Sequence, residues 1–590
     1  PEPDPAVSFA ERQRLFNLPR SSWADYDASL ISQGGGIFPR TAKSIPLSPE
    51  VRALLGLNKV EATPNEVMTA ILRAEADLLW FGGIGTYVRA SFESDAQVGD
   101  RANDAIRIAA GELRVKAVGE GANLGMTQRG RIEAARRGVR LNTDAIDNSA
   151  GVNTSDVEVN IKIALSTPVA EGVLSAPDRA ALLGEMTDEV GHLVLRNNYL
   201  QTLALSLAQR SGTSDTAFQQ RLMQMLEARG ELDRGVEYLP TDSEVQERRA
   251  RGEGLTRPEL AVLLAYAKLS LYSELLASDV PDNAYLADEL VHYFPHALQE
   301  RFPDAITSHR LRREIIATQL ANALINQGGP ATIARIADQT GTDAAAIARA
   351  FLVVRDSFGL PAITAAIDAL DAKIPGAVQL RLYAEVQDLM LARTIWVLRN
   401  VNLAAGIGPV VAQYRAGIEA LDTVLDETLP ENWRAWRDGK IAELVAAQVP
   451  EDLARKVASL RPLGAGTDIA LLAQTTGRSV AEAAATFFAA GLYFAGDEII
   501  SAAGSIVAPD YYDRLAMDRA MGQVETFVRD VSIGMLGTGK VGTEAVEAWV
   551  EGRRREVERT RATVKDIVAS GLTLSKLTLA ASLLADLARA

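Results

Sequence analysis

The chain has 590 residues and the apolar and charged fractions of an ordinary globular protein, so it can fill several domain cores. It has no cysteine, which excludes disulfide frameworks, thiolate metal sites and cysteine nucleophiles. Its net charge of −15 argues against nucleic acid as the main ligand, and no apolar run reaches the roughly 18–20 residues of a membrane span. We therefore expect a cytoplasmic protein that binds neither nucleic acid nor membrane.

Residues 1–47 are predicted to form an irregular arm, because they contain scattered prolines and the triplet Gly34-Gly35-Gly36. A structureless stretch of this length usually docks on a domain. Its candidate docking groups are Trp23, Tyr26, Ile37 and Phe38. The chain starts at Pro1 rather than at methionine, from which we expect a piece of a longer polypeptide.

Residues 48–165 alternate between helix and strand signals. Thr63-Pro64-Asn65-Glu66 is typical of a helix start, with Thr63 as N-cap and Glu66 closing a capping box. The other predicted segments are a helix from Ser48, a buried strand Asp77–Phe81, a brief helix Asn103–Ile108, a strand Leu113–Val118, a helix Thr127–Arg137 and a strand Val139–Leu141. This alternation predicts the second half of a Rossmann-like parallel α/β domain.

Strand signals nearly vanish after Asp156, so residues 166–330 and 331–590 are predicted to be two helical regions of an all-α C-terminal part. In the first of them, Thr256-Arg257-Pro258-Glu259 is a capping box that predicts a helix through Tyr272. A weak internal repeat marks the second region. Ile336–Gly341, followed by an Ala-rich amphipathic helix, recurs as Leu472–Gly477 with its own Ala-rich helix. By our count residues 1–165 carry only about −2 of the net charge, so the helical part carries most of it.

Two glycine turns are the main candidate binding sites in the sequence. Gly82-Gly83 and Gly121-Ala122-Asn123 each follow a predicted parallel strand. Ligands of open α/β sheets bind at the carboxyl ends of strands, and a backbone without side chains can approach a ribose or nicotinamide closely. The alternative is a pair of ordinary tight turns, and the pattern alone leaves both readings open.

Ser155 also has two readings. Ser155-Asp156-Val157-Glu158 fits a capping box, which makes Ser155 a helix N-cap. A helix N-terminus with a free hydroxyl is equally an anion site, where a substrate carboxylate could bind. Nearby, Asp144 and Asp147 could be paired catalytic carboxylates, but their position favours turn capping.

Three further patterns favour structural roles. Gly537–Gly542 matches GxGxxG, and Gly534–Lys540 is a near P-loop, but Val541 stands where a magnesium-binding Ser or Thr is needed. The helix-rich surroundings favour a loop between helices. His292 and His296 are four residues apart, yet Pro295 lies between them and no third ligand is near, so no metal site is predicted.

The sequence resembles the large NAD-specific glutamate dehydrogenases of bacteria. The strings that carry the resemblance are SFAERQRLFNLPRSSWADYD, DLLWFGGIGTYVRAS, VGEGANLGMTQRGRIE, NTDAIDNSAGVNTSDVEVNIK, TDEVGHLVLRNNYLQTLALSLA, LTRPELAVLLAYAKLSL and HRLRREIIATQLANALIN. They are long and specific up to about residue 360. Beyond that point the likeness is more diffuse.

The resemblance implies oxidative deamination of L-glutamate to 2-oxoglutarate and ammonia, with NAD as cofactor. The cofactor-binding residues that it implies are Gly82 and Gly83 on the adenosine side and Gly121, Ala122, Asn123 and Asn148 on the nicotinamide side. It places Ser155 against a substrate carboxylate.

The family's catalytic lysine and aspartate find no counterpart here and are expected upstream of residue 1, so this chain alone is expected to be inactive. Two other hypotheses stay open. In the first, the chain is a helical regulatory or oligomerisation module, as part of a homo-oligomer. In the second, which we do not favour, Gly534–Lys540 serves a P-loop nucleotidase.

Overall fold

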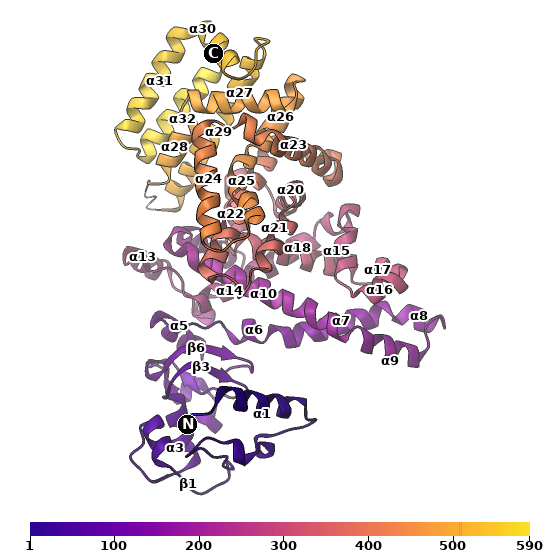
Figure 1. Cartoon of the computed structure of the whole chain (residues 1–590), viewed down its shortest axis with the longest axis vertical. Coiled ribbons are helices and arrows are strands. Elements are labelled where there is room, and N and C mark those ends of the chain that lie inside the picture. The colour runs from indigo at the N-terminus through magenta and orange to yellow at the C-terminus, as the bar shows by residue number, and fades with distance from the viewer. Residues whose placement is uncertain (507, 509, 590) are drawn as a thin grey trace.

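The computed structural model describes residues 1–506, 508 and 510–589 (Figure 1). An α/β portion lies at one end of the molecule, a helical arm projects from the middle, and the remaining helices stack toward the other end (Figure 1). In the described residues every strand lies before residue 121, so the predicted change from α/β to all-α is confirmed.

The α/β portion contains three two-stranded sheets rather than one continuous sheet. Antiparallel β1 (Ile45–Pro46) and β2 (Glu61–Ala62), parallel β3 (Glu75–Phe81) and β6 (Arg114–Glu120), and parallel β4 (Val88–Arg89) and β5 (Ile108–Ala109) form them. In the main pair Phe81 lies opposite Glu120. The predicted strand at Val139–Leu141 is present only as an isolated parallel bridge between Ala117 and Arg140.

Five short helices of the α/β portion connect or flank these strands. They are α2 (Pro49–Leu55), α3 (Pro64–Leu72), α4 (Asp95–Val98), α5 (Gln128–Arg136) and α6 (Asp144–Asp147). Thr63 caps α3 with the predicted capping box, and Thr127 caps α5. The helix predicted at Asn103–Ile108 is wrong, because a single 3-10 turn at Arg101–Asn103 leads into β5.

The apolar strand β3 is exposed, although its sequence predicts a buried strand. Leu78 is 56% and Trp80 is 59% exposed. Within the described residues only β6 pairs with β3, so one edge of β3 stays open. The apolar run identified the strand correctly, but burial depends on neighbours that the run cannot reveal.

The arm 1–47 is not irregular throughout. Residues Pro5–Asn17 form helix α1, with Asp4 accepting a hydrogen bond from the Val7 amide as N-cap. The expected docking groups Trp23, Ile37 and Phe38 remain exposed on the described chain.

Helices of the middle of the chain build the projecting arm and the layer next to the α/β portion. They are α7 (Ser149–Ala164), α8 (Ser166–Ala170), α9 (Ala176–Glu185), α10 (Thr187–Ser211), α11 (Thr216–Ala228), α12 (Arg234–Glu237), α13 (Asp242–Ala250), α14 (Arg257–Leu276), α15 (Ala287–His292), α16 (His296–Arg301), α17 (Pro303–Thr307) and α18 (Arg312–Gly328). His292 and His296 therefore fall on two different short helices.

The last 260 residues form the helical end of the molecule. Its helices are α19 (Thr332–Thr340), α20 (Ala344–Ser357), α21 (Leu360–Asp368), α22 (Gly376–Asn400), α23 (Ile407–Thr428), α24 (Glu431–Ala446), α25 (Glu451–Gly464), α26 (Gly466–Thr476), α27 (Val480–Tyr493), α28 (Gly496–Ala503), α29 (Tyr511–Leu536), α30 (Gly542–Glu551), α31 (Arg554–Ala569) and α32 (Leu574–Arg589). The near P-loop is a junction between α29 and α30, and a helix precedes it rather than a strand.

The weak repeat corresponds to a repeated order of elements. A short helix ends at a left-handed glycine, Gly341 after α19 and Gly477 after α26. An apolar helix and later a long helix follow in each case, α20 and α22 in one and α27 and α29 in the other. In both copies the glycine is needed because its φ is near +70°, a region that disfavours a Cβ.

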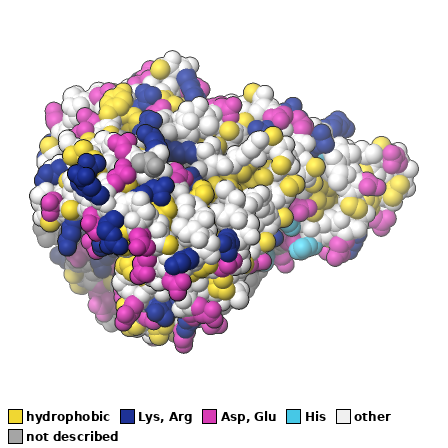
Figure 2. All heavy atoms as spheres, turned by 90° about the horizontal axis from the view of Figure 1, so that it is seen from above, with side chains coloured by type: hydrophobic (Ala, Val, Ile, Leu, Met, Phe, Trp, Pro, Cys, Tyr) yellow, Lys and Arg dark blue, Asp and Glu magenta, His cyan; other side chains and the backbone are white. Residues whose placement is uncertain are grey.

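Two surface properties bear on the expected partners, the distribution of charged side chains and the length of the apolar helices. Acidic and basic side chains are interspersed over the face seen from the helical end (Figure 2). No single helix among the described residues is both long and apolar enough to cross a membrane. The bent pair α20 and α21, at 69°, passes that test only together and only by length and composition.

Candidate cofactor-binding edge

The structure brings the two predicted glycine turns together. Parallel pairing of β3 with β6 sets both turns at the same sheet edge, where the Ala122 amide donates to the Phe81 carbonyl at 3.0 Å. The side chain of Asn148 donates from Nδ2 to Oδ1 of Asn123 at 2.5 Å. Two asparagines that are 25 residues apart therefore share one accessible edge.

Two aspartates hold the second turn in place. Asp147 accepts the Glu120 amide at 2.9 Å, and Asp144 accepts the Leu124 amide at 2.8 Å. Leu124 has a φ of +61°, so the turn contains a non-glycine residue in the left-handed region. These contacts support the turn-capping reading of Asp144 and Asp147.

A buried ion pair lies under the same turn. Glu120 is 1% exposed and binds Arg131 through two hydrogen bonds, at 2.7 and 2.9 Å. Arg131 also pairs with Asp144 at 3.1 Å. A buried charge is costly unless it is paired, so this cluster fixes the carboxyl end of β6 with little freedom.

The indole of Trp80 covers part of the glycine edge. A Cβ built on Gly119 would lie 2.5 Å from the Trp80 ring, and one built on Gly121 would lie 2.4 Å from it. In this structure the two glycines thus give close approach to an indole. At Gly83 a Cβ would meet nothing within 4 Å, so the backbone there is open.

Ser155 does not begin a helix, and the capping-box prediction is wrong. Helix α7 begins six residues earlier, at Ser149, with Asn148 as its N-cap residue. Asn148 lies at the break between α6 and α7. Ser155 lies exposed inside α7, so it offers a hydroxyl without the free amides of a helix N-terminus.

The helical part supports this edge through Arg257 of α14. Its guanidinium donates to Asn142 and, at 2.9 Å, to the Thr202 carbonyl of α10. Asn142 in turn donates to Asp147 at 2.6 Å. This chain of hydrogen bonds connects two helices of the all-α part to the turn that carries Asn123.

Lys268 is a residue near this edge that the sequence analysis missed. It donates to Gln201 at 3.3 Å, and Gln201 lies 3.4 Å from the hydroxyl of Ser149. Burial lowers the pKa of Lys268 to about 7. The available signal was a lysine among apolar residues in the predicted helix that starts after Thr256.

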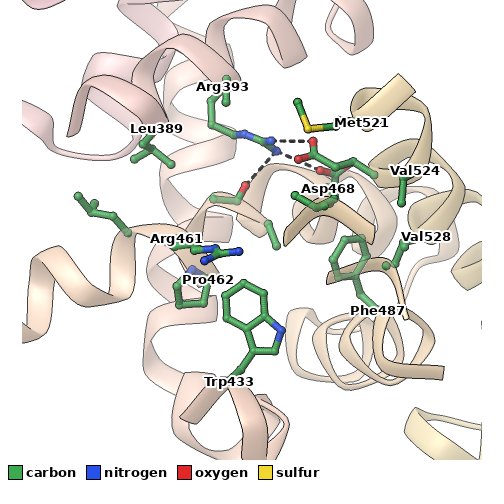
Figure 3. Close-up of a pocket in the computed structure, with 18 of the residues that line it drawn as sticks. Leu389, Arg393, Trp433, Arg461, Pro462, Asp468, Phe487, Met521, Val524 and Val528 are labelled. Atoms are coloured by element: carbon green, nitrogen blue, oxygen red, sulfur yellow. Dashed lines mark hydrogen bonds and ion pairs between the residues drawn. The ribbon is translucent and has the colours of Figure 1, made fainter. Parts of the chain in front are cut away.

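The helical end contains a hollow of about 590 Å³ (Figure 3). Trp433, Phe487 and Val524 are among its apolar lining residues. Arg393 and Asp468, both buried, point toward one another at its polar end and pair at 3.3 Å (Figure 3). No sequence pattern pointed to this cavity, because its walls come from helices far apart in the chain.

The geometry thus defines a predominantly helical protein with a short pair of parallel strands at one end. Residues 1–208 match the family model for the bacterial NAD-glutamate dehydrogenase catalytic domain, and residues 252–586 match that for the glutamate dehydrogenase C-terminal region. The chain belongs to the bacterial NAD-specific glutamate dehydrogenase family, as the sequence resemblance implied.

Curated relatives give the same result. The chain is 44% identical to the NAD-specific glutamate dehydrogenase of Pseudomonas aeruginosa over 100% of its own length and 37% of that protein. It is 42% identical to the protein of that name from Halomonas elongata, over 96% of the chain and 35% of the relative. For that of Mycobacterium tuberculosis the values are 39%, 97% and 36%. The chain therefore spans little more than a third of these relatives.

Proposed function

We propose that this chain is the C-terminal part of an NAD-dependent glutamate dehydrogenase and supplies the nicotinamide-facing edge of its active site. The reaction would be oxidative deamination of L-glutamate to 2-oxoglutarate and ammonia. NAD, when bound, supplies the hydride acceptor. The main supporting observation is the Asn123–Asn148 hydrogen bond at the shared end of β3 and β6, in a chain of this family.

The residues at this edge fit a dinucleotide. Gly83 leaves the backbone open for the adenosine side, and at Gly82 a Cβ would make only ordinary contact with Trp80, at 3.7 Å. The amides of Asn123 and Asn148 offer donors and acceptors to the carboxamide of a nicotinamide. Gly121 and Ala122 would border the same ring. For that contact the Trp80 indole either turns aside or stacks on the cofactor. In this proposal β3 and β6 belong to a Rossmann-like sheet.

Ser155 is the proposed contact to a substrate carboxylate. It lies seven residues after Asn148, which is about two helical turns and about 10 Å along α7. Two turns return the side chain to nearly the same face of the helix. The exposed hydroxyl of Ser155 can therefore lie on the face that Asn148 begins.

The chain alone is proposed to be inactive. The chemistry needs a general base and a lysine of lowered pKa close to the substrate. At the described edge the carboxylates of Asp144 and Asp147 are committed to backbone amides, and Lys268, whose pKa is lowered, is bound to Gln201 within the helical part. Purified chain with L-glutamate and NAD should form no NADH by absorbance, and glutamate-dependent NADH formation would contradict this proposal.

The alternative is a helical regulatory or oligomerisation module that does not bind the cofactor by itself. The position of Trp80 over Gly119 and Gly121 favours it, because the ring occupies the close approach that a cofactor would use. Homo-oligomerisation belongs to both readings and is a proposal that light scattering can test.

Titration with NAD separates the two proposals. We expect saturable heat in calorimetry and a change in Trp80 fluorescence, with Asn123→Ala weakening binding by about five- to tenfold through loss of its hydrogen bonds. Asn65→Ala, an exposed asparagine on α3, is the matched control and should bind like the wild type. Absence of heat in the wild type would favour the module.

A further inference from the structure

A polar cavity of about 430 Å³ lies away from the glycine turns, in the helical part. Its walls come from the end of α10, the start of α11, the start of α19, the middle of α22 and the start of α29. The size is within the range of small-molecule sites. Its lining is rich in charged and amide groups, and one of them, Asp388, also lines the larger hollow of Figure 3.

The lining of this cavity includes hydrogen-bond donors without acceptors. Helix α19 begins at Thr332 with no side-chain cap, and the amides of Ile333 and Ala334 have no acceptor in the part of the chain that is described. The Nε atom of Arg335 is buried without a hydrogen-bond partner among described residues, whereas that of Arg514 contacts Asp518 at 3.4 Å. A helix N-terminus with two guanidinium groups beside it favours a carboxylate.

The lining also includes acceptors without donors. Asp388 and Asp215 form no ion pair with any described residue, and burial raises the pKa of Asp388. Gln219 is 2% exposed, and its Oε1 has no donor in the described structure. An unsatisfied buried oxygen costs free energy, which a ligand with N–H groups would recover.

The charges of the lining groups balance. Arg335 and Arg514 share Asp518, at 3.0 and 3.4 Å, which leaves one positive charge on that cluster. Arg210 adds a second positive charge, and Asp215 and Asp388 supply two negative charges. A purely anionic or purely cationic ligand would leave the groups of one charge unmatched, whereas a ligand with both charges matches both kinds of group.

We propose that this cavity is a binding site for a small zwitterion, an α-amino acid. Its carboxylate lies at the N-terminus of α19 beside Arg335, and its ammonium group lies at Asp388. The site is separate from the proposed glutamate-binding edge and involves no chemical step. An occupant would connect α11, α19 and α22, which belong to different parts of the helical bundle.

Calorimetry on the 590-residue chain tests the site with L-leucine and L-glutamate as probes. Two half-ligands are the controls, 2-oxoglutarate, which lacks the ammonium group, and n-butylamine, which lacks the carboxylate. We expect saturable binding of at least one amino acid and at least tenfold weaker binding of both half-ligands. Asp388→Asn and Thr332→Val should each weaken amino-acid binding at least fivefold.

Asp388 lines the neighbouring hollow as well as the proposed cavity, whereas Glu385, one turn earlier on the same helix, lines the neighbouring hollow and not the proposed cavity. Glu385→Gln is therefore the control that separates the two cavities. It should leave binding unchanged. Asp388→Asn removes a carboxylate that forms no ion pair among the described residues. The unfolding temperature of this variant should therefore not fall, so its ligand binding can be measured on folded protein.

Three results would overturn the proposal. The first is no saturable binding of either amino acid at millimolar concentration. The second is binding that Asn148→Ala abolishes and Asp388→Asn leaves unchanged, which would place the ligand at the glycine-turn edge. The third is tighter binding of 2-oxoglutarate than of the amino acids, strengthened further by Asp388→Asn, which would make the cavity an anion site.

Discussion

The α/β edge and the helical end both bury charged side chains, but they use them differently. At the edge, Glu120, Arg131 and Asp144 lie beneath a turn and hold its backbone while the amides of Asn123 and Asn148 stay accessible. At the helical end, Arg393 and Asp468 pair between helices and are almost fully buried.

The buried charges of the α/β edge therefore position a candidate binding site, whereas those of the helical end hold helices together. At the α/β edge the buried charges hold the backbone of the turn, while other, uncharged side chains are left to contact a ligand. At the helical end the buried charges connect α22, α26 and α29, with Arg529 reaching Asp468 at 3.1 Å and Trp396 donating to it at 2.8 Å. Loss of a charge should therefore disturb ligand binding in one region and global stability in the other.

The largest expected effect is on the helical end. Asp468→Ala leaves Arg393 and Arg529 buried without their shared carboxylate and should cost about 3–5 kcal/mol of unfolding free energy. Denaturant unfolding followed by circular dichroism measures it. Glu525→Gln is the control, since Glu525 is partly exposed and should cost less. Equal costs for the two variants would contradict the packing role of Asp468.

The next effect concerns Lys268, between the two regions. Its pKa is lowered to about 7 in the folded chain and is about 10.4 when unfolded. Between these values the unfolded state binds more protons, so folding stability rises with pH; below pH 7 the folded chain carries the full cost of the buried charge. Lys268→Met should therefore be more stable than the wild type, most clearly near pH 7.

The advantage of Lys268→Met should shrink by about 1 kcal/mol per pH unit between pH 8 and 10. Urea midpoints at several pH values measure it. Lys162→Met, at a half-exposed lysine paired with Glu158, is the control and should show no such trend. A pH-independent difference for Lys268→Met would show that the lysine is solvated.

Local signals in the sequence predicted the elements well. Thr63 with Glu66 and Thr256 with Glu259 form the expected capping boxes, because a capping box needs only residues three apart. The same short pattern misled at Ser155, where α7 had already begun at Ser149. A capping box states that a helix can start, but it does not exclude an earlier start.

Contacts between distant segments could not be predicted by the same means. For Asn123 and Asn148, the rule that the carboxyl ends of parallel strands meet at one edge predicted a shared location but not their hydrogen bond. The exposure of Trp80 and the indole over Gly121 depend on which strands pair with β3. The polar cavity at α19 combines five helices, and no periodicity in any one of them indicates it.

The smallest of these effects tests the glycine edge itself. Gly121→Ala places a methyl group 2.4 Å from the Trp80 ring, so ring or backbone must shift, at a cost of about 1–3 kcal/mol. In the Trp80→Ala background the same change should cost almost nothing. The coupling from this double-mutant cycle, measured by thermal unfolding, isolates the contact.

Gly83→Ala is the matched control, because a Cβ there meets nothing within 4 Å and should be tolerated in both backgrounds. If Gly121→Ala costs the same with and without Trp80, the glycine serves something other than the indole. Combined with the NAD titration, the cycle then decides the role of Gly121. Restored stability together with tighter NAD binding in Trp80→Ala would mean that the indole competes with the cofactor at Gly121.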